Sequence, residues 1–299
     1  MYRYRLYGLC VLSDMEFPQL VPEPVEISDV PKIQIAQCKL IPDVMLEGEA
    51  DGKKYEFGKV LCWLSNRTAR LVVENGTRIR YSLKEGGKIS ALRNYILGFG
   101  MSMLAYQRNI LAIHCSAVAD EDGAVLIAGE SGAGKSTLTT AFLEKGYRLM
   151  ADDMAFVQTI GKETSVFPAF PYQKLCRNVA LEKGYDLAEL IYINEDKDKF
   201  LVPYTGEFGL EAVPVKAFVM LCVCDEGEVE VTRIQGIERA AVYTDNLFLR
   251  KLLGPRRYSP EFAQPCIEMA ANVPTYYVGR NNQDDNAELV RAEVFRIIT

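Results

Sequence analysis

The first part of the chain, up to about residue 85, alternates apolar and polar positions in short runs separated by turn residues, as β-strands do. The clearest example is ARLVVENGTRIRYSL, residues 69–83, in which Asn75-Gly76 separates two alternating runs. Because Asn and Gly tolerate the two positive φ angles of a type I′ turn, this stretch predicts a β-hairpin. The pattern as a whole predicts a smaller, β-rich N-terminal domain over residues 1–88.

The apolar positions then change to a helical period in KISALRNYILGFGMSMLAYQRN, which begins at Lys88. Gly98 and Gly100 weaken the middle of this segment, which predicts a connecting helix over residues 89–107. Residues 110–128 follow as two apolar segments, predicted to be strands joined by a turn at Asp120–Gly123. We assign residues 108–299 to a second domain.

The stretch GESGAGKST follows the second of these strands and fits the pattern G-x-x-x-x-G-K-[ST]. STLTTAFLEKG, which predicts a helix ended by Gly146, comes next. Glycines let backbone N–H groups point inward around an anion, and the helix N-terminus adds partial positive charge. The pattern predicts a nucleotide site made of Gly129, Glu130, Ser131, Gly132, Ala133, Gly134, Lys135, Ser136 and Thr137. A glycine-rich turn with a chance lysine is the alternative.

Within this loop, Lys135 is expected to contact the β- and γ-phosphates, and the Ser136 hydroxyl is expected to bind Mg²⁺. The predicted cofactors are therefore ATP and Mg²⁺, while the choice between ATP and GTP stays open.

Two aspartates end the next predicted strand, Tyr147–Ala151. Open α/β sheets bind ligands at the carboxyl ends of their strands, so Asp152 and Asp153 are expected beside the phosphates. Adjacent residues of an extended chain point to opposite sides, and we expect Asp152 to face the γ-phosphate. A carboxylate there can hold Mg²⁺ or accept a proton from an attacking hydroxyl, and the residues alone do not divide these roles. Two solvated aspartates in a turn are the alternative.

His114 is the only histidine of the chain. By alternation it shares a strand face with Ala112, Ser116 and Val118. A lone histidine in an apolar strand is most often a hydrogen-bonded core residue, so its position alone favours a structural role over chemistry.

Composition narrows the possible partners. The chain has 299 residues, 49% of them hydrophobic, and a formal charge of −6, which disfavours nucleic acid and anionic membranes. The apolar run at residues 217–224 is far shorter than the roughly 20 residues that cross a bilayer. The N-terminus lacks the features of a secretory signal, so we expect a cytoplasmic protein.

Eight cysteines are scattered without a CxxC pair and are expected to be free thiols. Cys222 and Cys224 form a CxC pair, but a zinc site needs further Cys or His ligands, and the chain has one His.

The spacing of three motifs resembles the catalytic domain of the HPr kinase/phosphorylase family. Lys135 lies 21 residues after His114 (135 − 114) and 17 residues before Asp152 (152 − 135). Further segments resemble successive landmarks of the wider HPr kinase-like group, so the likeness touches nearly the whole chain. They are YRLYGLCVLSDMEFPQL near the N-terminus, IHCSAV, FPAFPYQKL (167–175), DKFLVP (198–203) and VPTYYVGR (273–280).

This resemblance implies an α/β fold with a P-loop kinase core of the HPr kinase C-terminal type, preceded by the β-rich domain. In that family a serine hydroxyl receives the γ-phosphate, and the first aspartate of the pair is the base. Carried over, Asp152 is the base, Asp153 supports the metal or the loop, and His114 lies near the transferred phosphate. The predicted catalytic residues are therefore Asp152, His114 and Lys135, and the predicted metal ligands are Ser136 and Asp153.

The sequence also departs from the family. We find no Glu-(Ile/Val)-Arg-Gly segment after the aspartates, so phosphorylase activity and HPr as the substrate are not expected. Lys174 and Arg177, in FPYQKLCRN, and Lys199, with Lys197 nearby, are candidates for contacts with substrate.

Size and layout resemble the members that tailor lasso peptides, so the expected partner is a serine-containing peptide or protein, such as a ribosomal precursor. A P-loop hydrolase or switch and a nucleotide sensor are the rival functions, and the oligomeric state, including a homo-oligomer, stays open.

Overall fold

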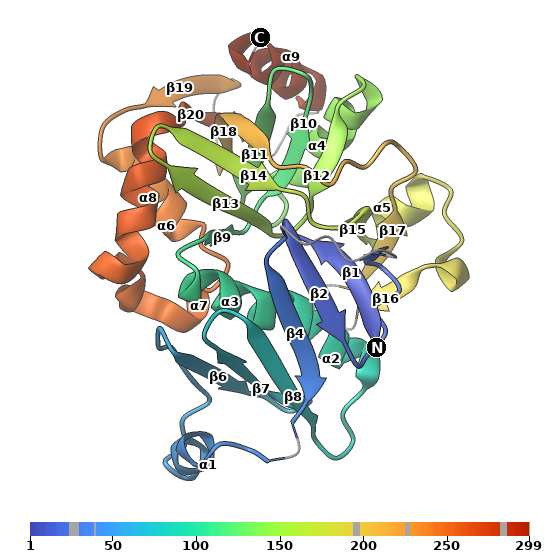
Figure 1. Ribbon diagram of the computed structural model, residues 1–299. Helices are drawn as coiled ribbons and strands as arrows, with labels where there is room; N and C mark the ends of the chain where they lie inside the picture. Colours follow the sequence, from blue (N-terminus) through green and yellow to red (C-terminus); the bar gives the residue numbers. More distant parts are fainter. Residues whose placement is uncertain (24–29, 39, 194–197, 225–227, 282–285, 299) are drawn as a thin grey trace. The chain divides into compact units, whose positions relative to one another are not determined.

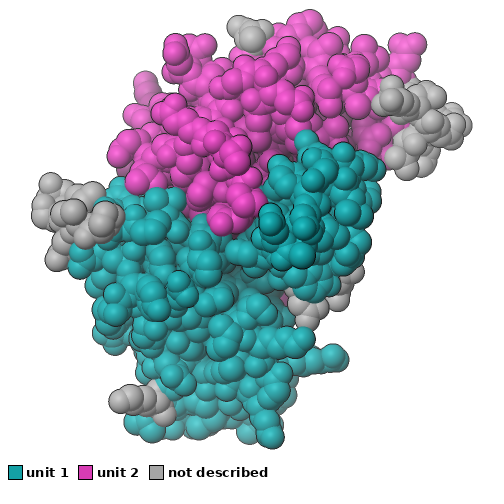
Figure 2. Space-filling view, turned by 90° about the vertical axis from the view of Figure 1, so that its right-hand side faces the viewer, with its two compact units in different colours: residues 1–110, 174–202 teal, residues 111–173, 203–299 magenta. Residues whose placement is uncertain are grey.

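The computed structural model describes residues 1–23, 30–38, 40–193, 198–224, 228–281 and 286–298. The fold is mixed α/β, with the described strands arranged in three sheets (Figure 1). The chain divides into two compact units, coloured separately in Figure 2. Unit 1 comprises Met1–Ile110 and Lys174–Val202, and unit 2 comprises Leu111–Gln173 and Pro203–Thr299. The expected boundary near residue 108 lies close to the first division, whereas residues 174–202, which we assigned to the second domain, group with unit 1.

Unit 1 is built on an eight-stranded sheet in the order β3-β1-β2-β4-β8-β7-β6-β5. The pairs β2–β4 and β4–β8 are parallel, and the other pairs are antiparallel. The strands are β1 (Tyr2–Leu6), β2 (Leu9–Ser13), β3 (Val21–Pro22), β4 (Lys32–Gln37), β5 (Tyr55–Glu56), β6 (Leu61–Ser65), β7 (Ala69–Glu74) and β8 (Arg78–Leu83). The alternation in the sequence thus marks a β-rich segment.

The predicted hairpin is confirmed. Strands β7 and β8 pair antiparallel, with Glu74 opposite Arg78. Asn75 has φ 54° and Gly76 has φ 62°, and the Thr77 N–H donates to the Glu74 carbonyl at 3.0 Å. The Asn-Gly pair therefore supplies the two left-handed positions that the turn requires.

The helical segment after the hairpin is present but not uniform. It consists of α2 (Ile89–Tyr95), a π-helical turn η1 (Ile96–Gly100) and α3 (Met101–Gln107). The wide turn falls where Gly98 and Gly100 weaken the α-helix. A Cβ on Gly100 would lie 3.4 Å from the Ile79 side chain of β8, which is an ordinary van der Waals distance.

Helix α1 (Asp43–Ala50), which the sequence pattern did not reveal, packs on the same sheet. Met45 and Trp63 are fully buried there, and a Cβ on Gly48 would lie 2.4 Å from the Trp63 ring. Glycine at position 48 is therefore what lets the helix lie flat on the indole.

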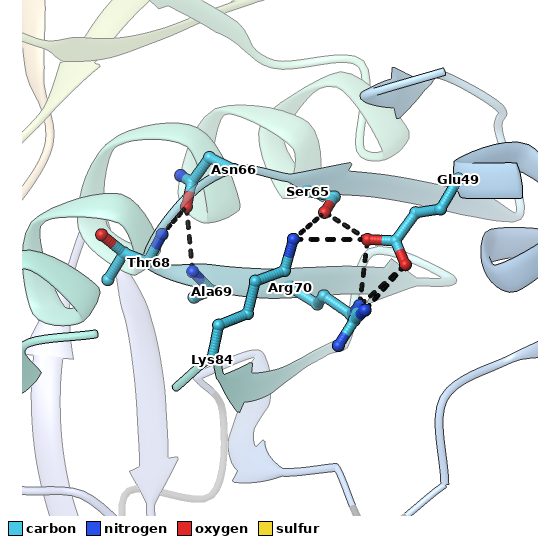
Figure 3. A network of polar contacts seen from close by, with 7 residues as sticks. All are labelled: Glu49, Ser65, Asn66, Thr68, Ala69, Arg70 and Lys84. Atoms are coloured by element: carbon cyan, nitrogen blue, oxygen red, sulfur yellow. Dashed lines mark hydrogen bonds and ion pairs between the residues drawn. The ribbon is translucent and has the colours of Figure 1, made fainter. Parts of the chain in front are cut away.

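A polar network ties α1 to the ends of β6, β7 and β8 (Figure 3). Both Glu49 carboxylate oxygens accept from Arg70 Nε, at 3.0 and 2.9 Å, and the Ser65 hydroxyl also donates to Glu49. Lys84 Nζ lies 3.5 Å from Glu49 and donates to Ser65 Oγ at 2.6 Å. The hydrogen bond from Arg70 is the main cause that lowers the pKa of Glu49 to about 2. The ionised form of Glu49 is therefore stabilised by folding.

We expect Glu49→Gln to destabilise unit 1 by about 2 kcal/mol at pH 7, because it removes charge-assisted hydrogen bonds. The carboxylate titrates near 4.5 when exposed and near 2 in the fold, so its contribution is complete above the higher value. The difference between wild type and variant should therefore shrink as the pH falls from about 4.5 to about 2. Urea unfolding followed by the fluorescence of Trp63, the only tryptophan, measures it.

Glu56→Gln is the matched control, because Glu56 lies 4.0 Å from Lys53 and is well exposed. A stability difference for Glu49→Gln that stays constant between pH 7 and pH 3 would contradict the expectation.

Unit 2 contains the sheet that positions the candidate site. Its order is β12-β10-β11-β18-β14-β13-β9, and β20 pairs with both β18 and β19. The strands are β9 (Leu111–Ile113), β10 (Ser116–Ala119), β11 (Ala124–Gly129), β12 (Arg148–Ala151), β13 (Ala155–Ile160), β14 (Glu163–Phe167), β18 (Val213–Cys224), β19 (Glu230–Ile234) and β20 (Thr275–Asn281).

Strand directions bring several strand ends to one edge of this sheet. Strands β11, β18 and β20 are parallel. Strand β10 is antiparallel to both β11 and β12, so β12 runs in the same direction as β11. The carboxyl ends of β11, β12, β18 and β20 therefore meet the amino end of β10 at the same edge.

Two helices of unit 2, α4 (Lys135–Glu144) and α9 (Ala287–Ile298), pack against the strands that end at this edge. The other helices of unit 2 are α6 (Glu238–Asp245), α7 (Arg250–Leu253), η3 (Gly254–Tyr258) and α8 (Pro260–Asn272). Helices α4 and α9 share one core with β10, β11, β18 and β20. The ring centres of Phe142 and Phe295 lie 4.5 Å apart. This apolar packing holds the N-terminus of α4 at the edge where the strands end.

The third sheet has the order β15-β17-β16, and most of its residues belong to unit 1. Its strands are β15 (Tyr172–Cys176), β16 (Ile191–Ile193) and β17 (Lys199–Pro203), and the helices α5 (Arg177–Glu182) and η2 (Leu187–Glu189) lie between β15 and β16 in the sequence.

All eight cysteines are free, and Cys10, Cys62, Cys115 and Cys266 are buried. Among the helices of the described ranges, none is long and apolar enough to span a bilayer.

Candidate functional site

The glycine-rich loop connects β11 to α4, so the predicted order of strand, loop and helix is present. Gly129 has φ 148°, Gly132 has φ 89° and Gly134 has φ 101°, all in the region that side chains rarely adopt. A Cβ on Gly129 would lie 2.7 Å from the carbonyl oxygen of Leu221 on β18. Glycine is therefore required at this position by the neighbouring strand as well as by the turn.

Lys135, the first residue of α4, folds back over the loop. Its Nζ donates to the Gly129 carbonyl at 2.6 Å and to the Glu130 carbonyl at 3.1 Å. Ser136 is half-buried and Thr137 is exposed in the same helical turn. The ammonium group and the first N–H groups of α4 thus gather positive charge at the loop.

His114 lies between two strands, and this differs from the prediction that it lies within one strand. Residues 110–119 were expected to form one strand, but β9 ends at Ile113 and β10 begins at Ser116. Strand β9 pairs with β13, whereas β10 pairs with β11 and β12, so the chain changes partners at this point. The His114 N–H donates to the Asn246 carbonyl at 2.7 Å, which fixes the bend. His114 therefore does not share a regular strand face with Ala112 and Ser116.

The imidazole of His114 is oriented by Asp153. His114 Nδ1 lies 2.8 Å from the Asp153 backbone oxygen and 3.8 Å from its Oδ1. A carbonyl oxygen only accepts, so Nδ1 carries a hydrogen, and in the neutral ring Nε2 holds the lone pair. Asp153 has a left-handed backbone, with φ 70°, a conformation uncommon outside glycine. The contact with Asp153, which follows β12, thus holds the neutral imidazole in one tautomer.

Asp152 has a different partner. The Ser116 hydroxyl donates to Asp152 Oδ1 at 2.5 Å, and Ser116 is 2% exposed. The two residues are adjacent because Ala117 of β10 pairs with Ala151 of β12. The aspartates therefore contact different neighbours, as expected from their adjacency in the chain. Ser116 was not among the predicted site residues, although its hydroxyl contacts one of them.

The pKa of the buried Cys115 thiol responds to three charges of the candidate site. Burial raises the pKa of Cys115 above its usual range. The charge of Lys135 lowers the same pKa, and the charges of Asp152 and Asp153 raise it. Cys115, which follows His114 in the chain, therefore experiences the charges of the loop lysine and of both aspartates.

Arg280, at the end of β20, completes the loop and was also missed. Its Nε donates to the Ala133 carbonyl at 3.2 Å, and its Nη2 donates to the Gly132 carbonyl at 3.0 Å. In the sequence, Arg280 was only the last residue of VPTYYVGR. Its position at the carboxyl end of a strand is the signal that could have identified it.

The three candidate substrate residues, Lys174, Arg177 and Lys199, lie in unit 1. Arg177 Nη2 donates to Asp198 at 3.0 Å, and the guanidinium lies 5.1 Å from the centre of the Phe200 ring. Its charge is therefore already paired. Lys197 lies outside the described residues. A role of these cations in binding substrate stays a prediction.

The oxygen atoms at the sheet edge suit a hard cation. The described residues hold no group of three or more His, Cys, Asp or Glu that could bind a metal by itself. Mg²⁺ needs no such group, because it commonly takes one or two protein carboxylates and completes its shell with phosphate and water. The hydroxyl of Ser136 and the carboxylate of Asp153 have the right chemistry for that arrangement.

No family model matches the sequence, and no curated protein matches it. Among solved structures, the chain is similar to the Hpr(Ser) kinase/phosphatase from Coxiella burnetii, with 13% identity and a TM-score of 0.32. The match covers 62% of this chain and 89% of that one. At this TM-score the likeness carries no weight, and the proposal below depends on the residues described above.

Proposed function

We propose that this protein is a phosphotransferase that binds ATP and Mg²⁺ and transfers the γ-phosphate to a serine hydroxyl of a peptide or protein. The observation that supports it best is the hydrogen bond from Ser116 to Asp152, which fixes a carboxylate at the sheet edge where the glycine loop ends. We also propose that the fold is a P-loop kinase core of the HPr kinase C-terminal type, preceded by a β-rich domain.

Binding of the phosphates would use backbone and side-chain groups of the loop. The N–H groups of residues 129–137 and the N-terminus of α4 favour an anion. Lys135 exchanges its carbonyl contacts for the β- and γ-phosphates, where its charge offsets the charge that builds up on the phosphoryl oxygens. Arg280 keeps the loop carbonyls occupied from the other side.

Transfer would use Asp152 as the general base. The serine oxygen forms a bond to the γ-phosphorus as the bond to the β,γ-bridging oxygen breaks, and the hydroxyl proton passes to the Asp152 carboxylate. ADP leaves with the bridging oxygen. Ser116 holds the carboxylate in one orientation, so that less reorganisation is needed at the moment of transfer.

Ser136 and Asp153 would hold Mg²⁺, which when bound offsets negative charge on the phosphate oxygens. His114, held by the Asp153 carbonyl, would lie beside the transferred phosphate, and in its imidazolium form its Nε2–H would donate to a phosphate oxygen. Both roles are taken from the resemblance of the motif spacing to the HPr kinase/phosphorylase family.

For the acceptor we propose a short serine-containing peptide, such as a ribosomal precursor of the lasso type. This choice rests on the resemblance in size and layout, and on the missing Glu-(Ile/Val)-Arg-Gly segment.

The test is to incubate the protein with ATP, Mg²⁺ and a panel of serine-containing peptides and to look for phosphoserine by mass spectrometry. We expect a phosphorylated peptide with the wild type and none with Lys135→Ala. ATP hydrolysis that depends on Lys135 and Asp152 without any phosphorylated acceptor would favour a hydrolase instead.

Replacing Ser116 with Ala should show whether Ser116 orients the Asp152 carboxylate or contributes to the binding of ATP. We expect kcat to fall about tenfold while KM for ATP is unchanged, because a lost hydrogen bond to a charged group costs about 1.5 kcal/mol. Ser165→Ala is the control, because Ser165 on β14 donates to Glu163 at 3.3 Å. An unchanged kcat, or a loss that appears in KM for ATP instead, would exclude this role for Ser116.

A further inference from the structure

A cavity of about 120 Å³ lies beside the glycine loop, on a side that the proposed chemistry does not use. It is bounded by the start of α4, by Leu221 of β18, by Arg280 of β20 and by the first turns of α9. Its walls thus come from four elements, brought together by the apolar core that α4 and α9 share.

The position of the cavity follows from the strand order. Strand β11, which leads into the loop, lies between β10 and β18. Asp152 and His114 are on the β10 and β12 side, whereas the cavity is on the β18 and β20 side. A ligand that lies across the loop with its terminal phosphate toward Asp152 would therefore extend its other end toward the cavity.

The lining suits a flat heterocycle with polar edges. Leu138, Leu221 and Val290 supply apolar surface. Asn286 Nδ2 donates to the Asn281 carbonyl at 3.2 Å, whereas Asn286 Oδ1 is buried without a hydrogen-bond partner among the described residues. The Nε of Arg291 is also buried without a hydrogen-bond partner among the described residues, whereas its Nη1 donates to Glu288. An acceptor and a donor are thus left for a ligand.

We propose that this cavity holds the base of the donor nucleotide, with Asn286 Oδ1 accepting from an N–H of the base. The inference rests on the proposed function, because it requires a triphosphate on the loop. The volume is below the roughly 300 Å³ of pockets that enclose drug-sized ligands, so it fits the base rather than the complete nucleotide. Arg291 can stack on the ring, as guanidinium groups do on aromatic faces.

Arg280 connects the two halves of this arrangement. Its guanidinium contacts the loop carbonyls, and a Cβ on Gly134 would lie 3.7 Å from its Nε. It also lines the cavity. The α-phosphate and ribose of a bound nucleotide would pass beside it, on the way from the loop to the base.

The test compares ATP with inorganic tripolyphosphate, which has the phosphates but no base. Isothermal titration calorimetry in the presence of Mg²⁺ should show that the wild type binds ATP at least about tenfold more tightly than tripolyphosphate, a difference of about 1.4 kcal/mol. Ala287→Trp, which fills the cavity from the first residue of α9, should remove that difference and leave tripolyphosphate binding unchanged. Asn286→Ala should weaken ATP a few-fold and tripolyphosphate not at all. Leu289→Trp, on the exposed side of the same helix, is the matched control and should change neither.

Each other outcome rejects a specific part of the account. If tripolyphosphate binds in a Lys135-dependent manner but Ala287→Trp leaves ATP affinity unchanged, the cavity assignment fails and the loop assignment stands. Equal affinity of wild type for the two ligands also rejects the cavity. If Ala287→Trp weakens both ligands equally and Asn286→Ala has no effect, the base does not bind there. If tripolyphosphate does not bind, or binds independently of Lys135, the proposed function itself is wrong.

Discussion

Replacing Lys135 with Ala is expected to lower ATP turnover by about 100-fold or more, the range found when one preorganised charge-stabilising donor is removed. The ammonium group lies 2.6 Å from the Gly129 carbonyl, so it is already gathered at the loop before any phosphate is bound. Its loss removes a positive charge from the place where negative charge develops during transfer. A coupled ATPase or kinase assay, with titration calorimetry for binding, measures the effect.

Lys145→Ala is the matched control for this experiment. Lys145 follows the C-terminal end of the same helix, and its Nζ lies 3.8 Å from the centre of the Phe295 ring. Its removal should leave turnover close to that of the wild type. Wild-type activity in Lys135→Ala would remove the phosphate-loop assignment.

Asp152→Asn should preserve nucleotide binding and lower the transfer rate by roughly 10²- to 10⁴-fold, which is the contribution of a general base. The amide has nearly the shape of the carboxylate, and its oxygen can still accept from Ser116, so the local structure is retained. What it cannot do is take up the proton of the acceptor hydroxyl. The measurement is kcat together with the dissociation constant for ATP, determined on the same preparation.

Asp153→Asn provides the contrast, because its backbone oxygen orients His114 and its carboxylate is the proposed metal ligand. We expect this variant to need more Mg²⁺ for half-maximal activity and to lose less of its maximal rate. If Asp152→Asn instead loses ATP binding, then Asp152 acts through the metal or the fold, and the assignment of the base is wrong.

Local signals were sufficient for part of the fold. The Asn75-Gly76 pair predicted the hairpin because the two positive φ angles are a property of those residues themselves. Likewise, Gly129 and Gly134 predicted the turn between β11 and α4. Asp152 and Asp153 directly follow β12, as expected. In each case the conformation is decided within a few neighbouring residues.

Long-range pairing decided the rest. The apolar alternation continues through His114 and Cys115, so nothing local marks the point where the chain leaves β13 and joins β11. Arg280 contacts the loop from a separation of 147 residues, and the cavity depends on α9, which is more distant still in the sequence. The grouping of residues 174–202 with unit 1 is likewise a property of tertiary contacts.

The most direct measurement is a crystal structure of the protein with Mg²⁺ and a non-hydrolysable ATP analogue. The attacking oxygen lies about 3 Å from both the phosphorus and the base, so the Asp152 carboxylate should be within about 6 Å of the γ-phosphorus. Lys135 should contact the same phosphate, and His114 should lie beside it. A separation of about 10 Å or more, with the carboxylate turned away from a phosphate held elsewhere, leaves no place for proton transfer and would contradict the proposed reaction.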